Sequence, residues 1–295
     1  MLEPDLRKTS LERMGVAPAI IAAQPFLKWA GGKGQLLTQL DGLLPKQLDI
    51  YFEPFTGGGA VFFHLKHRFP RMRAFLRDSN ADLINAYQVV RDFPDDLMAR
   101  LDEHLAHYRV ERERYFYHIR SQHEVPFEAV VERAARMIFL NKTCFNGLWR
   151  VNARGQFNVP IGSHKNPALY DRGNILAASL ALQGAHLAVQ DFRNTMEEAG
   201  AGDFIYIDPP YAPVSPTASF TSYTREEFGL EAQRELAGLF AGGARRGVRL
   251  MLSNSDTPFI RELYGDFVIH TVRARRAINS NGLKRGEINE VVITC

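Results

Sequence analysis

Short apolar runs alternate along the chain with longer stretches in which apolar residues recur at helical spacing. Runs that are apolar on both faces suit strands of a parallel sheet that is buried between layers of helices. The last two runs follow one another without a helical stretch and indicate antiparallel pairing at that end. The pattern predicts an α/β fold with a doubly wound, seven-stranded sheet. Its expected strands are 50–55, 73–78, 185–191, 203–208, 248–254, 266–273 and 290–294.

Helices dominate the chain between the second and third expected strands. A turn-rich segment over 145–162 follows them, in which two extended runs flank Ala153–Gly155. This arrangement predicts a β-hairpin with Gly155 in the turn. Helical spacing places expected helices at 81–92, 95–120 and 127–141 in this region, and at 36–44 and 60–68 before it.

The change of pattern divides the 295 residues into three parts. We expect a main domain built from 25–80 and 170–295, which carries the sheet. Residues 81–169 form an inserted domain of helices and a hairpin, and residues 1–24 form a weakly ordered arm.

Composition is that of a soluble globular protein, with 45% hydrophobic and 23% charged residues. No apolar run approaches the roughly 18 residues that a membrane span needs, and acids among the first ten residues argue against a signal peptide. Cys144 and Cys295 offer neither a disulfide framework nor a zinc site. We therefore expect a cytoplasmic protein that binds no metal and no membrane.

The net charge of +3 favours no class of partner, but its distribution is uneven. Residues 133–165 and 271–286 contain basic side chains and no acid. Such stretches in a nearly neutral chain are typical of enzymes that bind nucleic acid, and chance clustering on a solvated surface is the alternative. The basic residues are Arg133, Arg136, Lys142, Arg150, Arg154, Lys165, Arg273, Arg275, Arg276, Lys284 and Arg285.

The sequence Asp208-Pro209-Pro210-Tyr211 directly follows the apolar run 204–207. The two prolines remove backbone donors and end strand pairing, so the carbonyls of Asp208 and Pro209 should point into a crevice. We expect no donor near these acceptors except the Tyr211 hydroxyl. This set suits a planar group with an NH₂, such as the Watson–Crick edge of adenine. A strand end with a proline-rich turn is the alternative interpretation.

Three consecutive glycines, Gly57–Gly59, connect the first expected strand to a helix. Glycines let the backbone approach a ligand closely and supply N–H groups at a helix start, but the spacing matches neither a dinucleotide fingerprint nor a P-loop. Asp78 ends the next strand, where an acid in doubly wound folds binds ribose hydroxyls. Asp78 could equally cap the helix that follows. Together these features predict an adenosine-containing cofactor at the strand ends.

Several independent motifs, in their order, resemble the Dam-like DNA adenine methyltransferases. They are Phe26–Lys33 (FLKWAGGK), Glu53–Gly59 (EPFTGGG), the hairpin from Asn146 to Pro160, and Asp208–Tyr211 (DPPY). The resemblance covers the chain from about Phe26 to its end. It implies a Rossmann-like methyltransferase fold, S-adenosyl-L-methionine as cofactor, and methylation of a flipped-out adenine in double-stranded DNA, within GATC. We expect a bacterial or phage enzyme that is a monomer in solution.

The resemblance also implies a cofactor site. Lys33 would meet the methionine carboxylate, a task that suits a compact cation. Asp78 would hold the ribose, and the glycines would flank the cofactor. Asp191 and Phe192 would lie at its adenine. The implied site comprises Trp29, Lys33, Phe55, Gly57, Gly59, Asp78, Asp191, Phe192 and Asp208.

The implied chemistry follows from the electronic structure of adenine, whose amino lone pair is delocalised into the ring. Hydrogen bonds from this NH₂ to the Asp208 carboxylate and the Pro209 carbonyl would favour a pyramidal nitrogen with its lone pair aimed at the methyl group. Tyr211 would stack on the base. Catalysis would then be mainly orientation and electrostatics, without a covalent enzyme intermediate.

The adenine must leave the duplex before it can react, at a cost of a few kcal/mol. Arg150 can donate twice to a guanine edge, although in isolation a phosphate contact would be the simpler interpretation. Phe145 occupies the position of an aromatic wedge. In the family, the positions of Lys28, Asn146, Leu148, Arg150 and Pro160 contact DNA or read bases. Phosphate contacts are expected from Lys142, Arg154 and the basic stretch 273–286.

Three alternatives remain at this point. An RNA methyltransferase could present an amino group to a related Pro-Pro motif. A cytosine amino-methyltransferase is less compatible, because such enzymes usually have Ser at the position of Asp208. A DNA-binding module with an inactive catalytic fold is disfavoured by the presence of Trp29, Lys33, Asp208 and Tyr211.

Overall fold

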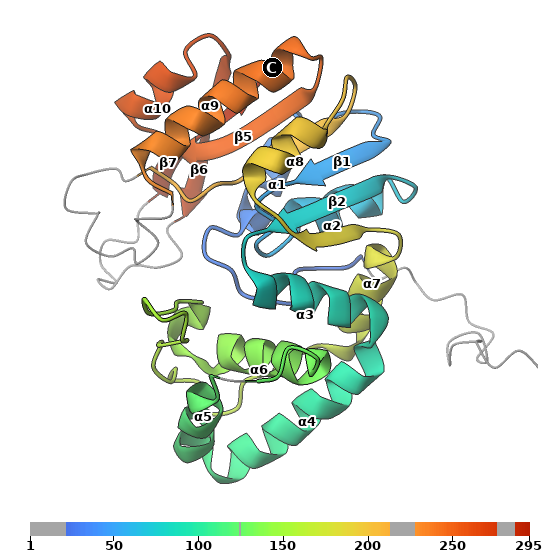
Figure 1. The fold of residues 1–295 in the computed structure, drawn as a ribbon, viewed down its shortest axis with the longest axis vertical. Helices are drawn as coiled ribbons and strands as arrows, with labels where there is room; N and C mark the ends of the chain where they lie inside the picture. Colours follow the sequence, from blue (N-terminus) through green and yellow to red (C-terminus); the bar gives the residue numbers. More distant parts are fainter. Residues whose placement is uncertain (1–21, 124, 213–227, 276–286) are drawn as a thin grey trace, which may run out of the picture.

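A computed structural model describes residues 22–123, 125–212, 228–275 and 287–295 (Figure 1). Its strands form one seven-stranded sheet in the order β3-β2-β1-β4-β5-β7-β6. Strands β1 to β5 pair in parallel, whereas β7 is antiparallel to both β5 and β6. The predicted doubly wound α/β sheet with an antiparallel end is confirmed. The strands are β1 (Ile50–Glu53), β2 (Arg73–Asp78), β3 (His186–Val189), β4 (Phe204–Ile207), β5 (Arg249–Ser255), β6 (Val268–Arg275) and β7 (Glu287–Thr294).

Alternate residues of the central strands supply two separate cores. Tyr206 and Met251 point to one face of the sheet, and their neighbours Ile205 and Leu252 point to the other. Such apolar strands can be stable only with helices on both faces. Helices α2 (Ala60–Arg68), α3 (Ala81–Asp92) and α7 (Arg172–Leu182) cover the first face, and α8 (Phe192–Glu198), α9 (Leu230–Arg245) and α10 (Pro258–Leu263) cover the second.

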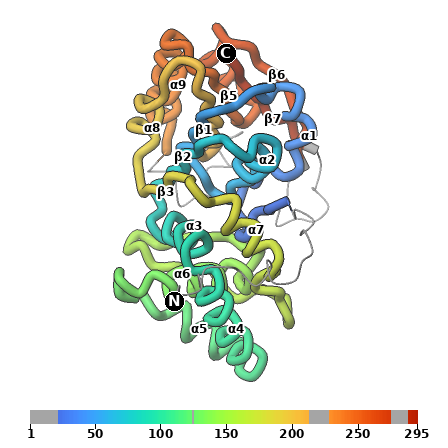
Figure 2. The backbone as a smooth tube through the Cα atoms, turned by 90° about the vertical axis from the view of Figure 1, so that its right-hand side faces the viewer, coloured from blue at the N-terminus to red at the C-terminus, as the bar shows by residue number. Residues whose placement is uncertain are grey.

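The inserted helices form a second lobe beside the sheet, and α3 lies between the two lobes (Figures 1 and 2). The single helix expected over 95–120 is wrong, because the backbone leaves the helical region at Glu111. The break lets Tyr108 and Phe116 both pack against Phe139. Their ring centroids lie 5.6 Å and 6.5 Å, respectively, from that of Phe139. The lobe contains α4 (Pro94–Val110), α5 (Arg112–Ser121), α6 (Val130–Thr143) and the short 3₁₀ helix η3 (Phe145–Gly147).

The helix expected over 36–44 is also shorter than its leucine spacing suggested. The chain forms a 3₁₀ turn, η2 (Lys33–Gln35), and one turn of α-helix, α1 (Leu37–Leu40), and then continues in turns. The spacing reflects burial, because a run of turns can bury every fourth side chain as a helix does. The leucines concerned are Leu36, Leu40 and Leu44, each at most 5% exposed.

The expected hairpin over 145–162 is present but carries no regular strand. Gly155 has a φ of +73° in its turn, as the turn chemistry requires. The isolated antiparallel bridges that hold the segment together are Cys144–Ile161 and Val151–Phe157. The expected arm 1–24 lies almost entirely outside the described residues, as does most of the basic stretch 273–286. No helix in the described ranges is long and apolar enough to cross a membrane.

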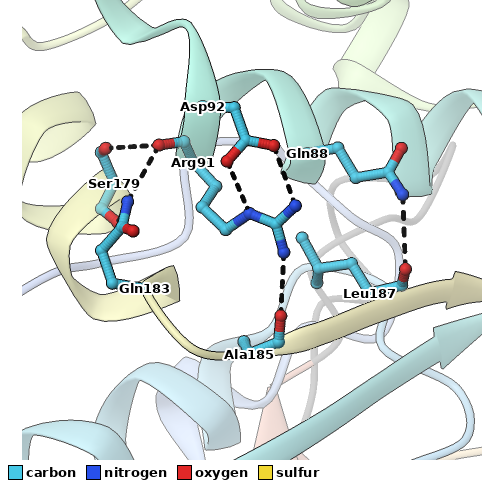
Figure 3. Close-up of polar contacts among 7 residues, drawn as sticks. All are labelled: Gln88, Arg91, Asp92, Ser179, Gln183, Ala185 and Leu187. Carbon is cyan, nitrogen blue, oxygen red and sulfur yellow. Dashed lines mark hydrogen bonds and ion pairs between the residues drawn. The ribbon is translucent and has the colours of Figure 1, made fainter.

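The C-terminal turn of α3 fastens the inserted lobe to the sheet (Figure 3). The Arg91 guanidinium donates to the Ala185 carbonyl at 2.9 Å, at the start of β3. The Arg91 carbonyl in turn accepts a 3.0 Å hydrogen bond from the Ser179 hydroxyl on α7. One residue therefore joins α3 to both its neighbours. The remaining contacts drawn in Figure 3 involve Asp92, Gln183, Gln88 and Leu187.

We predict that Arg91→Ala lowers the free energy of unfolding by about 1–3 kcal/mol, because charge-assisted hydrogen bonds to half-buried groups are lost. Urea unfolding followed by circular dichroism measures this change. The control is Arg114→Ala, since Arg114 is 82% exposed and pairs only with Glu111 among the contacts resolved for it. The control should change stability by less than about 0.5 kcal/mol. Equal effects of the two substitutions would contradict this role for Arg91.

Candidate active site and DNA interface

The carboxyl ends of β1, β2 and β4 meet at one edge of the sheet. Strands β1 and β4 lie side by side, yet the chain continues from β1 into α2 on one face and, further along, from β4 into α9 on the other. Ligands of doubly wound sheets bind in the crevice at such a change of direction. The glycine loop after β1, Asp78 at the end of β2 and Asp208 after β4 are thereby brought together.

The Asp208 carboxylate forms an ion pair with Lys33, with 2.7 Å between Oδ1 and Nζ. The Lys33 side chain is only 4% exposed, and its ammonium also donates to the Gly31 carbonyl at 2.6 Å. Burial raises the pKa of Asp208, while the Lys33 ammonium opposes this rise. The expectation that only the Tyr211 hydroxyl would be a donor near Asp208 is therefore wrong. A buried ammonium needs an anionic partner, and Asp208 supplies it.

Tyr211 is held from both sides. Its ring centroid lies 4.8 Å from Lys33 Nζ, a cation–π distance, and its hydroxyl donates to Glu290 Oε2 at 2.9 Å. Glu290 lies in β7, two strands away from β4 in the sheet. Sequence reasoning missed Glu290, whose one signal is an acid directly before the apolar run Val291–Ile293.

A buried amide network supports the Asp208–Tyr211 segment from behind. Gln233 of α9 donates to the Pro210 carbonyl at 2.8 Å and accepts from Asn254 of β5 at 3.1 Å. Asn254 also accepts from the Ala212 N–H at 3.2 Å. The Pro210 carbonyl is thereby held from behind the segment. Neither Gln233 nor Asn254 belongs to a recognisable motif, so the sequence gives no signal for them.

The glycine loop is shaped by its neighbours. Gly57 has a φ of +48°, and its N–H donates to Asp78 Oδ2 at 3.1 Å. A Cβ at Gly57 would lie 2.8 Å from the Trp29 ring, and one at Gly59 would lie 2.5 Å from the Tyr87 hydroxyl. Both positions therefore require glycine, and Trp29 is fixed against the loop.

Asp78 does not cap the following helix. Asn80 does so, since its side chain accepts from the N–H groups of Asp82 and Leu83 at 3.0 Å. Asp78 instead holds the glycine loop, and burial raises the pKa of its carboxyl. The helix-cap interpretation of Asp78 is thus wrong.

Three aromatic rings pack together beside the glycine loop. Phe55 and Phe192 stack with centroids 5.4 Å apart, and Phe228 packs edge-on against both at the same distance. Asp191 is exposed, caps α8 through the Arg193 N–H and pairs with the Arg193 side chain. Sequence reasoning missed Phe228, which lies in a stretch without a recognisable motif.

Glu53 ends β1. Its side chain is 2% exposed, and its Oε2 atom has no hydrogen-bond partner among the residues that the structure describes. Burial raises the pKa of Glu53 well above its usual value, and the nearby Asp208 and Asp78 charges add to this. An unpaired buried oxygen of this kind is typical of a site built to meet a ligand. Among the described residues, no cluster of His, Cys, Asp or Glu could hold a metal ion.

The predicted DNA-contacting residues other than Lys28 lie in the segment 145–160, which follows α6. The Phe145 N–H donates to the Pro160 carbonyl at 2.9 Å, which closes the base of the hairpin. Arg150 Nε donates to Asn158 Oδ1 at 2.7 Å. Leu148 is half-buried, whereas the side chains of Lys28, Phe145, Asn146, Arg150, Arg154 and Pro160 are exposed.

Comparison with known proteins agrees with this geometry. Residues 29–278 match the D12 class N6 adenine-specific DNA methyltransferases. The type II methyltransferase M.MjaIII of Methanocaldococcus jannaschii is 42% identical over 92% of this chain and 98% of its own length. For the type II methyltransferase M1.LlaDCHI of Lactococcus lactis, the values are 41%, 93% and 96%. The DNA adenine methylase of Escherichia coli is 36% identical over 90% of this chain and 93% of its own.

A solved structure described as an antibiotic-related methyltransferase aligns with 93% of this chain at 10% identity and a TM-score of 0.32. The family match, in contrast, covers the glycine loop, the inserted lobe and the Asp208–Tyr211 segment. It also decides between the alternatives considered from the sequence, in favour of adenine in DNA over RNA or cytosine. The chain belongs to the D12 class N6 adenine-specific DNA methyltransferases, a family that uses S-adenosyl-L-methionine.

Proposed function

We propose that this enzyme methylates the adenine of GATC in double-stranded DNA and that Asp208 and Pro209 receive the flipped base. The observation that carries the proposal is the position of the Asp208 carboxylate, at the end of a central strand and fixed by Lys33 at 2.7 Å. The relatives include both type II methyltransferases and DNA adenine methylases, so the family alone does not fix the target sequence. GATC is proposed from the recognition residues.

The crevice has the chemical groups that S-adenosyl-L-methionine requires. The stacked rings of Phe55 and Phe192 suit its adenine, and Asp78 suits its ribose hydroxyls. Lys33 has three N–H donors, of which Asp208 and Gly31 take two. We assign the third to the methionine carboxylate. When bound, the cofactor supplies a methyl group on a positively charged sulfur, which is a good leaving group.

The residues of the site orient the base rather than react with it. The adenine N6 donates one hydrogen to the Asp208 carboxylate and the other to the Pro209 carbonyl, so that its lone pair is exposed. Tyr211 provides the stacking face, and Glu290 fixes the tilt of that ring through the tyrosine hydroxyl. Catalysis then depends on preorganised hydrogen bonds in a buried pocket, which need no rearrangement during the reaction.

The exposed residues of the inserted lobe read and open the duplex. Phe145 is 52% exposed, and a large apolar side chain in that position can fill the gap that the flipped adenine leaves. Arg150 reads guanine, and Leu148 and Pro160 contact thymine methyl groups. Arg154 and Lys142 bind phosphates.

We predict that wild-type enzyme with S-adenosyl-L-methionine makes duplex GATC sites resistant to a nuclease that cuts only unmethylated GATC. Asp208→Ala should reduce the methylation rate by about 100-fold to 1,000-fold, because the acceptor of the amino group is lost. Duplex affinity should stay within about threefold, since Asp208 contributes little to it. Incorporation of labelled methyl groups and fluorescence anisotropy of a labelled duplex give the two quantities.

Because Asp208→Ala also leaves the Lys33 ammonium without its partner, circular dichroism must show that the variant is folded. Asp203→Ala is the matched control, since Asp203 immediately precedes the same strand at its opposite end. Parallel loss of DNA binding and activity in Asp208→Ala would contradict the assigned role. Methylation of adenine only outside GATC would reject the target sequence and keep the chemistry.

We also predict that duplex affinity depends on pH through Lys142. Burial, reinforced by Lys28, lowers the pKa of Lys142 to about 8. A DNA phosphate favours the charged form, so binding takes up a proton above that pKa. Affinity should therefore be constant below about pH 7 and fall by up to about tenfold per pH unit above about pH 8. Anisotropy titrations at fixed ionic strength measure this.

Lys142→Arg provides the comparison, because a guanidinium stays charged throughout this range. Its affinity should lack the decline between about pH 8 and about pH 9. Identical pH profiles for the wild type and Lys142→Arg would show that Lys142 does not contact a phosphate.

A further inference from the structure

The side-chain amide of Asn141 connects two segments that are far apart in the sequence. Its Oδ1 accepts from the Lys28 N–H at 2.9 Å, and its Nδ2 donates to the Lys28 carbonyl at 2.7 Å. The same Nδ2 donates to the Gly147 carbonyl at 3.1 Å. One amide thus binds both backbone groups of Lys28 and also the turn after α6.

The turn itself has little freedom. Asn146 and Gly147 have φ values of +57° and +66°, in the left-handed region that is costly for a residue other than glycine. Gly147 is packed against the aliphatic stem of Lys28, so that a Cβ there would lie 2.7 Å from Lys28 Cδ. Surrounding contacts must hold such a conformation, and the Asn141 amide is one of them.

Asn141 is completely buried, at 0% exposure, whereas the side chains of Lys28, Phe145 and Asn146 are exposed. Asn141 therefore cannot contact DNA itself. It fixes the distance between a lysine of the N-terminal segment and the recognition turn, both of which face the proposed DNA surface. A shift of about 1 Å between positioned groups is enough to impair a well-oriented site.

We propose that Asn141 is a positioning residue for target discrimination, which holds Lys28 and the 145–148 turn in the register that the cognate sequence requires. This inference rests on the proposed function, because Lys28 and the turn are the residues assigned there to DNA reading. Discrimination would then depend on more than the exposed side chains. Lys28 and the 145–148 turn, which come from different parts of the chain, must also be held in a fixed relative position.

The test uses Asn141→Asp, which keeps the size of the side chain but can donate to neither carbonyl while ionised. The measured quantity is the ratio of kcat/KM for the cognate duplex to that for duplexes with one changed base pair. We expect this ratio to fall about tenfold or more, as for the loss of one base contact. Cofactor affinity, from intrinsic fluorescence, should change less than about threefold.

Asn85→Asp is the matched control for the loss of a buried amide. Asn85 is 5% exposed, and its Nδ2 donates to the Val130 carbonyl at 2.9 Å, away from the recognition turn. It should lower the thermal midpoint as Asn141→Asp does, without changing discrimination. If Asn141→Asp does not fold, Gly147→Ala decides, because its new Cβ pushes the turn away from Lys28.

A folded Asn141→Asp with wild-type discrimination would overturn the proposal, as would an equal loss of discrimination in Asn85→Asp. If Gly147→Ala is the deciding variant, wild-type discrimination in it would do the same. A wild-type enzyme that methylates no duplex adenine would instead reject the proposed function, and the two failures are therefore distinguishable.

Discussion

The ion pair between Lys33 and Asp208 is the interaction on which the rest of the site depends. Both charges lie in a crevice at the end of a buried strand, and Lys33 is 4% exposed. Burial removes such an ammonium from water, and the charged form is stable there only if an anion compensates the lost hydration. The pair therefore fastens the Phe26–Lys33 segment to the end of β4, favours the charged form of Asp208 against the effect of burial on its pKa and places a cation over Tyr211. The Phe26–Lys33 segment, Asp208 and Tyr211 therefore all depend on this one ion pair.

The sheet explains how Lys33 and Asp208 come close enough to form this ion pair. Parallel strands bring the ends of β1, β2 and β4 to one edge, and amides from α9 and β5 take up the backbone groups behind the Asp208–Tyr211 segment. The acceptors that we propose for the base are thereby fixed before any substrate arrives, as electrostatic preorganisation requires. The inserted lobe is attached through α3, so the turn proposed to face DNA and the proposed catalytic site are parts of one framework.

Much of the fold could be predicted from the sequence, because strands buried on both faces leave a strong apolar signal. The parallel sheet, its antiparallel end and the positions of the glycine loop, Asp78 and Asp208 at strand ends all follow from that signal, whereas the order of the strands does not. Helix boundaries could be predicted less accurately than strands. The break at Glu111 and the turns after Leu40 leave buried residues at the same spacing as a continuous helix would. The Lys33–Asp208 pair, Gln233, Glu290 and Asn141 could not be predicted, because their roles arise from contacts between residues distant in the sequence.

We propose that Asp208 and Pro209 receive the amino group of an extruded adenine beside the cofactor. A crystal structure of the enzyme with S-adenosylhomocysteine and a duplex containing the target sequence tests it most directly. We expect the adenine N6 at about 2.6–3.2 Å from an Asp208 carboxylate oxygen and from the Pro209 carbonyl. Lys33 should remain within reach of both Asp208 and the cofactor carboxylate. A base that stays stacked in the duplex, or an extruded base that does not contact Asp208, would contradict the account.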